Sequence, residues 1–288
     1  MFDHLKLLRC FSFTASRDWL FKQSFSNAGL RSVITDLSNG NPLASTTTSM
    51  HCWIPKSPNR SKPNLLLLHG FGANAMWQYG EHLRAFTGRF NVYVPDLLFF
   101  GLSSTSEPNR SESFQAQCLM RLMEAHGVHR MSIVGISYGG FVGYNMEDGL
   151  FKVPNLEEAT KILIPQTPEK LKELIRFSFV KPIKGVPSFF LWDFIDVMCV
   201  EFVEEKRDLI KSILKDRRLS DLPRIKQKSL IIWGEEDQIF PLELGYRLKR
   251  HIGENAEIVV IKKAGHAVNL EKSKEFLKHL KSFLIDSL

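Results

Sequence analysis

The chain has 288 residues, of which 44% are hydrophobic and 24% charged, so we expect one large domain with an inserted subdomain, or two small domains. Its formal net charge is +7, but basic residues are mixed with acids in predicted helices, as at 204–207 and 215–218. This mixing, without a recognisable nucleic-acid module, excludes nucleic acid as an expected partner.

The four cysteines are Cys10, Cys52, Cys118 and Cys199. They form no closely spaced pair, which argues against a zinc site and against a disulfide framework. We therefore expect no metal, buried thiols at Cys52 and Cys118, and a reducing compartment, the cytoplasm. The sequence has no apolar run of about 18 residues, so we expect no transmembrane helix.

Residues 1–30 form a predicted N-terminal extension that mixes basic, serine and aromatic residues. An organelle transit peptide is one interpretation, but Asp3 and Asp18 argue against it because transit peptides are poor in acids. The alternative is an aromatic helix that packs on the domain. Its apolar side chains are also candidates for peripheral membrane contact. These are Phe11, Phe13, Trp19, Leu20 and Phe21.

Strands and helices are predicted to alternate after this extension. Strands at 32–36 and 51–54 are expected to form a hairpin, and the apolar run Leu65–Leu68 suits a strand covered on both faces. The elements expected next are a helix at 75–86, a strand at 90–94, a helix at 113–126 and a buried strand at 132–136. This alternation predicts an α/β fold with a mostly parallel, doubly wound sheet.

The alternation stops at about residue 151. Residues 151–222 are expected to form a helical lid, whereas 31–150 and 223–288 form the core. Within the lid, we expect Phe189, Phe190 and Trp192 to contact the substrate. The elements expected after the lid are a strand at 229–234, a helix at 242–251, a strand at 256–261 and a helix at 270–284.

The chemistry is expected to centre on Ser137. It occupies the middle of Gly135-Ile136-Ser137-Tyr138-Gly139, which follows a predicted strand and precedes a predicted helix. In that setting the motif predicts a nucleophile elbow, a tight turn that exposes the serine hydroxyl and needs small residues on either side. The backbone N–H groups of Tyr138 and Phe71 are the candidate oxyanion hole.

A serine nucleophile needs a base, and the base needs an orienting acid. His266 and Asp237 each follow a predicted strand, in the order Ser, acid, His that is typical of this type of sheet. We therefore expect a triad of Ser137, Asp237 and His266, with Glu235 and Glu236 as alternative acids. No organic cofactor is expected, because the glycines lack the lysine of a phosphate-binding loop.

Residues 65–284 resemble the α/β-hydrolase superfamily. The likeness is greatest to plant proteins of the esterase/lipase type, which are akin to monoacylglycerol lipases and to carbon–carbon bond hydrolases. The matching motifs are residues 69–72, 95–101, 135–140, 233–237 and 265–266. The resemblance implies the same triad. It also excludes haloalkane dehalogenases and epoxide hydrolases, which carry aspartate where this chain has Ser137.

The sequence departs from the family pattern after about residue 146. Most of the helix that follows Ser137, and the core strand after it, are expected to be missing, a loss of roughly 30 residues if a βαβ crossover is the measure. In the family's sheet, this strand lies between the strand that precedes Ser137 and the strand that precedes Asp237. Its loss would move Ser137 away from Asp237 and His266, or would leave a gap in the sheet. We interpret the junction Met146–Glu147 as a skipped exon or a gene-model error.

Three functions follow from these observations. The first is a hydrolase of carboxylic esters or related acyl substrates, with a covalent acyl-enzyme intermediate. The second is a non-catalytic isoform or ligand-binding protein, favoured by the missing segment. The third is an acyltransferase, for which we find no supporting His-x-x-x-x-Asp motif. The expected partner is a small acyl or ester substrate, and the sequence predicts no oligomeric state.

Overall fold

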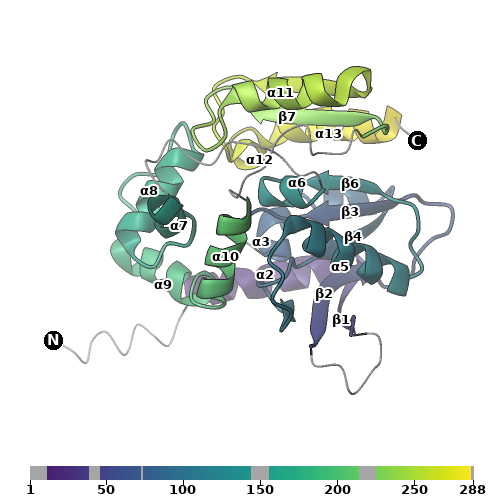
Figure 1. Cartoon of the computed structure of the whole chain (residues 1–288), viewed down its shortest axis with the longest axis horizontal. Coiled ribbons are helices and arrows are strands. Elements are labelled where there is room, and N and C mark those ends of the chain that lie inside the picture. Colours follow the sequence, from purple (N-terminus) through teal and green to yellow (C-terminus); the bar gives the residue numbers. More distant parts are fainter. Residues whose placement is uncertain (1–11, 39–45, 73, 144–155, 214–224, 287–288) are drawn as a thin grey trace. The chain divides into compact units, whose positions relative to one another are not determined.

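This computed structural model describes residues 12–38, 46–72, 74–143, 156–213 and 225–286. The chain falls into two compact units. The first comprises the residues up to Gly143 together with Val186–Asp208, and the second comprises Tyr144–Gly185 together with Leu209–Leu288. Each unit contains its own sheet, so the strands are described one unit at a time (Figure 1).

The sheet of the first unit has the order β1-β2-β4-β3-β6, with β5 paired to β2. Its strands are β1 (Leu30–Asp36), β2 (Thr48–Pro55), β3 (Asn64–Leu68), β4 (Asn91–Pro95), β5 (Ser104–Thr105) and β6 (Ser132–Gly135). The predicted hairpin is confirmed, since β1 and β2 are antiparallel, and β2 pairs antiparallel with β4 and β5 as well. Because only β4, β3 and β6 run parallel here, the sheet is mixed.

The helices of the first unit pack on this sheet and on one another. They are α2 (Phe13–Asn27), α3 (Ala75–Tyr79), α4 (Arg84–Thr87), α5 (Glu112–Ala125), α6 (Tyr138–Gly143), α9 (Ser188–Met198) and the first part of α10 (Val203–Ile213). Helix α3 packs against β3 and β4, α6 packs against β3 and β6, and α2 packs against β1, α3 and α9.

The N-terminal extension forms the helix α2. This agrees with the interpretation of the extension as an aromatic helix that packs on the domain. The helix begins where Ser12 Oγ accepts a hydrogen bond from the Ala15 N–H, and Phe25 is fully buried against Trp53. Phe21, one of the candidates for peripheral membrane contact, is buried, and such contact by the helix stays a prediction. Phe13, Trp19 and Leu20 are each at least half exposed, whereas Phe11 lies outside the described residues.

The expected helix at 75–86 is interrupted, with α3 ending at Tyr79 and α4 beginning at Arg84. Between them, the Phe21 ring of α2 approaches Gly80 so closely that a Cβ there would meet Phe21 Cδ1 at 2.3 Å. This contact across the fold requires a glycine at position 80, and helical periodicity gives no sign of it.

The second unit holds a parallel pair of strands, β7 (Ser229–Gly234) and β8 (Ala256–Ile261). Its other elements are α7 (Leu156–Leu163), α8 (Pro168–Ser178), α11 (Leu242–Ile252), the 3-10 helix η2 (Gly253–Asn255), α12 (Val268–Glu271) and α13 (Ser273–Asp286). Both strands pack against α11 and α13, and the buried cluster of this unit is lined by Ile231, Leu248, Ile252 and Ala256. The two strands and α11 are confirmed almost at their predicted bounds.

Strand β6 was expected to be buried, and that expectation is wrong for Ile133, which is 55% exposed. Among the described residues, β6 pairs only with β3, and β7 pairs only with β8. An edge strand has a neighbour on one side alone, which leaves its side chains less covered. The missing segment itself stays a prediction, since residues 144–155 lie outside the described part of the chain.

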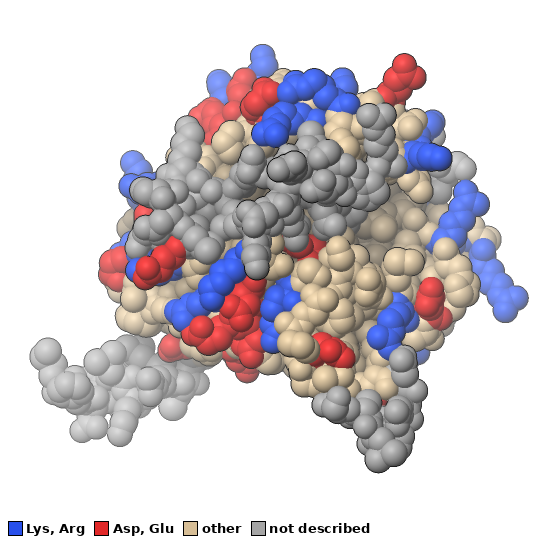
Figure 2. Space-filling model, viewed as in Figure 1, with Lys and Arg blue, Asp and Glu red and all other residues tan. Residues whose placement is uncertain are grey.

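Two surface properties bear on partners. In the described part of the chain, no helix is both long and apolar enough to span a membrane. Acidic residues lie beside basic ones over the face shown in Figure 2. The absence of a nucleic-acid partner stays a prediction.

A tight turn follows β4 at residues 96–101, where Gly101 has φ +53° and a Cβ would lie 2.1 Å from Asp96 Oδ2. We predict that Gly101→Ala lowers the free energy of unfolding by at least about 2 kcal/mol, because it combines a strained left-handed residue with a clash at a buried carboxylate. Urea denaturation would measure this loss.

The matched control is Gly88→Ala. Gly88 has φ −67°, and a Cβ there would meet nothing within 4 Å. Its substitution should leave the free energy of unfolding unchanged or raise it by up to about 1 kcal/mol. Equal effects of the two substitutions would contradict the assigned strain at Gly101.

A second prediction concerns the junction Met146–Glu147. Because a βαβ crossover takes roughly 30 residues, we expect most transcripts to carry an extra in-frame segment of roughly 90 nucleotides between these codons. Sequencing the transcript across the junction measures this directly. If most messages are uninterrupted there, the skipped-exon interpretation is wrong and the short form is the protein's normal one.

Candidate active site

Ser137 lies in a tight turn between β6 and α6. It has φ +51°, a left-handed conformation that is uncommon for any residue other than glycine. A Cβ on Gly135 would lie 2.4 Å from Gly139 O, and a Cβ on Gly139 would lie 2.5 Å from Leu68 O. The predicted need for small residues on either side of Ser137 is therefore borne out by these close approaches.

The loop after β3 lies against this turn. A Cβ on Gly70 would be 3.2 Å from Ser137 Cβ, and the Gly70 N–H donates to Gln78 Oε1 at 3.2 Å. The next residue, Phe71, packs edge-on against the ring of Tyr138, with ring centroids 5.5 Å apart. The two residues predicted to supply the oxyanion hole are thus neighbours of each other and of Ser137 in the first unit.

His69 fixes the shape of that loop. Its Nε2 accepts a hydrogen bond from the Leu97 N–H at 2.9 Å, and its Nδ1 donates to Gly70 O at 2.8 Å. Because Nε2 accepts from an amide, the ring is the neutral tautomer with the proton on Nδ1. Burial lowers the pKa of His69, which favours the same neutral form.

Gln115 on α5 is a residue that the sequence did not single out. Its Oε1 accepts from the Leu98 N–H at 2.9 Å, while its Nε2 donates to the Tyr138 hydroxyl at 3.2 Å. This side chain therefore joins the turn after β4 to the residue that follows Ser137. A glutamine inside an amphipathic helix gives no signal for such a role.

In the second unit, Asp237 and His266 form the predicted acid–base pair. His266 Nδ1 and Asp237 Oδ2 are 2.9 Å apart, and the other carboxylate oxygen accepts from the backbone N–H groups of Ile239 and Phe240, both at 2.8 Å. The Asp237 side chain is 6% exposed and that of His266 is 17% exposed. A buried carboxylate held by three donors orients the ring and leaves Nε2 as the nitrogen that accepts a proton.

The alternative acids lie elsewhere. Glu235 and Glu236 are exposed, and Glu235 Oε2 accepts from the Lys263 N–H at 3.3 Å. The structure therefore pairs His266 with Asp237, the acid that the sequence favoured.

Two further features position the loop that carries His266. A Cβ on Gly234 would lie 2.1 Å from Gly265 O, so only glycine permits this approach of the two strand ends. Glu271, which the sequence left without a role, accepts from the Gly265 N–H at 2.7 Å and from the Val180 N–H at 2.9 Å. Pairings that join residues 91 positions apart cannot be read from local spacing.

The predicted lid residues lie on α9 in the first unit. Phe189 is 49% exposed and Trp192 is 45% exposed, whereas Phe190 packs on Phe13 with ring centroids 4.7 Å apart. Phe190 thus helps to hold α2 against α9. A role of these three residues in substrate binding stays a prediction.

The structure thus brings the predicted residues together in two groups. Ser137, Phe71 and Tyr138 lie together in the first unit, and Asp237 and His266 are paired in the second. Within the described residues there is no cluster of three or more histidine, cysteine or acidic side chains that could hold a metal ion. The first group suits nucleophilic attack and the second suits proton transfer.

Residues 65–279 match the alpha/beta hydrolase family, and the chain belongs to that family. It is 23% identical over 258 residues to a monoacylglycerol lipase of Mus musculus, covering 77% of this chain and 76% of the relative. It is 26% identical over 258 residues to the 2-hydroxy-6-oxononadienedioate/2-hydroxy-6-oxononatrienedioate hydrolase of Paraburkholderia phymatum, covering 77% and 87%. The resemblance inferred from the motifs is confirmed, and the protein is a hydrolase of this fold.

Solved structures show the same fold. A putative lipase from Acinetobacter baumannii AYE has a TM-score of 0.72 at 23% identity, covering 94% of this chain and 96% of that one. The 2-hydroxy-6-oxo-6-phenylhexa-2,4-dienoate hydrolase from Rhodococcus sp. strain RHA1 has a TM-score of 0.68 at 20% identity, covering 88% and 98%. At these identities the likeness concerns the fold.

The lowered pKa of His69 predicts a pH dependence of stability. The unfolded chain binds a proton at His69 below about pH 6.5, whereas the folded chain does not until a lower pH, so stability is lost as the pH falls through that interval. His69→Gln should remove this contribution, which reaches at most about 1.4 kcal/mol per pH unit. Urea midpoints for both proteins, between about pH 7.5 and about pH 5, would measure it.

The substitution is expected to cost stability at every pH, because the bonds to Leu97 and Gly70 change. The decisive quantity is therefore the difference between the two slopes. A decline on acidification that is as steep in His69→Gln as in the unaltered protein would contradict the assignment of this pH dependence to His69.

Proposed function

We propose that this protein is a serine hydrolase that cleaves carboxylic esters or related acyl substrates. The observation that carries the proposal is the Asp237–His266 pair, in which a buried carboxylate orients an imidazole at the ends of β7 and β8. The strained turn at Ser137 supports the same interpretation, since a nucleophile elbow holds its serine in such a conformation.

In the proposed reaction, Ser137 Oγ attacks the carbonyl carbon of the ester and His266 Nε2 takes the hydroxyl proton. Asp237 keeps the Nδ1 proton of His266 in place and stabilises the positive charge that forms on the ring. The leaving alcohol then receives the proton from Nε2, and an acyl group remains on Ser137. Water, activated by the same histidine, releases the acid and restores the serine.

Negative charge develops on the carbonyl oxygen as Ser137 attacks. In the proposal, the backbone N–H groups of Phe71 and Tyr138 stabilise this charge. Gly70, His69 and Gln115 support these two donors, because their contacts hold the loop after β3 and the turn at Ser137 in shape. Because these N–H groups are already in position before the reaction, they stabilise the transition state without having to reorient during it.

The named relatives act on two substrate classes, the monoacylglycerols of the lipase and the 2-hydroxy-6-oxo dienoates of the bacterial hydrolase. We propose the ester class for this chain. The aromatic side chains Phe189 and Trp192 on α9, which are half exposed, support an apolar acyl group as the bound portion. A series of p-nitrophenyl esters of increasing acyl length would determine the preferred chain.

Turnover of p-nitrophenyl esters tests the proposal. The mechanism requires Ser137 Oγ to come within hydrogen-bond reach of His266 Nε2. Ser137→Ala should therefore abolish steady-state turnover, and Asp237→Asn should lower kcat about 10⁴-fold because the wrong tautomer of His266 is favoured. KM should change far less than kcat, since Asp237 acts through His266 in the transition state.

The matched control for Asp237→Asn is Glu236→Gln, which removes one negative charge from the neighbouring exposed residue. It should leave kcat unchanged. If the unaltered, folded protein turns over no ester, the non-catalytic alternative replaces this proposal. If Asp237→Asn retains full kcat, the assigned acid is wrong.

A further inference from the structure

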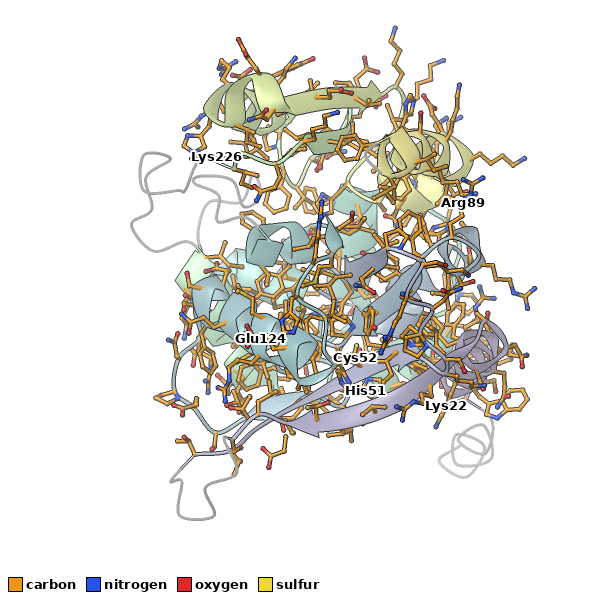
Figure 3. The ribbon with its side chains drawn as sticks, turned by 90° about the vertical axis from the view of Figure 1, so that its right-hand side faces the viewer. Lys22, His51, Cys52, Arg89, Glu124 and Lys226 are labelled. Atoms are coloured by element: carbon orange, nitrogen blue, oxygen red, sulfur yellow. The ribbon has the colours of Figure 1, made fainter. Side chains whose placement is uncertain are left out.

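A second serine–histidine–aspartate relay lies in the first unit; of its three members only Asp96 belongs to a family motif, the one at residues 95–101. The oxygen Ser32 Oγ is 2.8 Å from His51 Nε2, and His51 Nδ1 is 2.7 Å from Asp96 Oδ2. Figure 3 labels His51 beside Cys52 on β2. This is the order of atoms that activates a serine in nucleophilic catalysis: hydroxyl, imidazole and carboxylate.

The antiparallel pairing of β1 and β2 assembles the relay. Ser32 lies opposite Trp53, and His51 lies opposite Ile34, two positions further along β1. Residues two positions apart on a strand share a face, so the serine and the histidine are diagonal neighbours on one face of the sheet. Asp96 joins them because it follows β4, which pairs with β2.

Asp96 is held as an acceptor. Its Oδ1 accepts from the Ala75 N–H at 2.9 Å, and its Oδ2 accepts from the Leu102 N–H at 3.3 Å as well as from His51. A carboxylate with these donors fixes the proton of the neutral ring on His51 Nδ1. The other nitrogen, Nε2, is then the acceptor for the Ser32 hydroxyl.

The histidine and the aspartate of the relay are buried, whereas its serine is accessible to a substrate. His51 is 3% exposed and Asp96 is 4% exposed, while Ser32 is exposed on the edge strand β1. An imidazole that only needed its hydrogen bonds satisfied could use any hydroxyl, as His126 does with Thr35 Oγ1 at 3.1 Å. What sets His51 apart is the buried carboxylate of Asp96 on its far side, which holds the ring in one orientation.

The residue opposite Ser32 adds an independent observation. Trp53 is 3% exposed, and its indole N–H has no hydrogen-bond partner among the described residues. A buried donor without a partner is uncommon and costs free energy. This donor belongs to the residue that pairs with Ser32 across β1 and β2.

We propose that Ser32 is a second activated nucleophile, which takes acyl groups from small carboxylic esters. Ser32 Oγ bonds to the carbonyl carbon while the bond from that carbon to the leaving oxygen breaks. The hydroxyl proton passes to His51 Nε2 and then to the leaving group, so that the products are the acylated serine and a free alcohol or phenol. The site is independent of Ser137, Asp237 and His266.

The experiment uses the full chain carrying Ser137→Ala and the aryl ester p-nitrophenyl acetate. Peptide mass spectrometry after timed exposure gives the rate of acetylation of each serine. We expect Ser32 to be acetylated about 100-fold faster than an unassisted serine, which is the lower range for a positioned general base. His51→Gln should remove that advantage.

The internal reference is Ser61, an exposed serine whose hydroxyl donates to the amide oxygen Asn59 Oδ1 at 2.8 Å. The proposal is overturned if Ser32 reacts no faster than Ser61, an outcome that does not depend on any variant at His51. It is also overturned if folded His51→Gln is acetylated at Ser32 as fast as the parent. Loss of ester turnover in Ser137→Ala bears only on the proposed hydrolase activity, so the two proposals can fail separately.

Discussion

The carboxylate of Asp96 is the interaction on which the first unit depends. It accepts from the start of α3 at Ala75, from the turn after β4 at Leu102, and from His51 on β2. The turn that it holds also presents the Leu97 N–H to His69, whose other nitrogen donates to Gly70 O beside Ser137. A single buried charge thus orders the surroundings of both serines, because each donor that it satisfies would be costly to leave unpaired.

The sequence predicted the elements whose signals are local. The apolar runs gave the strands of both units, the glycines around Ser137 predicted its tight turn, and the order of Asp237 and His266 predicted their pairing. The contact of Phe21 with Gly80 and the roles of Gln115 and Glu271 were beyond prediction. Each of these depends on a contact between segments far apart in the chain, where periodicity and spacing carry no information.

The relay at Ser32 was missed for the same reason. Its members are 19 and 45 residues apart, and neither Ser32 nor His51 lies in a recognisable motif. Only the register of β1 and β2 and the pairing of β4 bring them together. Among the described residues β6 and β7 have no strand in common, and Ile133 is exposed. The missing segment expected after residue 146 stays a prediction.

His266 and His51 are both hydrogen-bonded to a carboxylate, but they differ in their exposure to solvent, and this difference affects the proton transfers that each can support. The side chain of His266 is 17% exposed, whereas that of His51 is 4% exposed and contacts Ser32 through Nε2. A partly exposed imidazole can exchange protons with a leaving group and with water, as a complete hydrolytic cycle requires. The buried imidazole of His51 contacts Ser32 but is less accessible to a hydrolytic water molecule. Acylation at Ser32 should therefore be followed by slow release, and the site acts on reactive esters as an acceptor that saturates rather than as an efficient hydrolase.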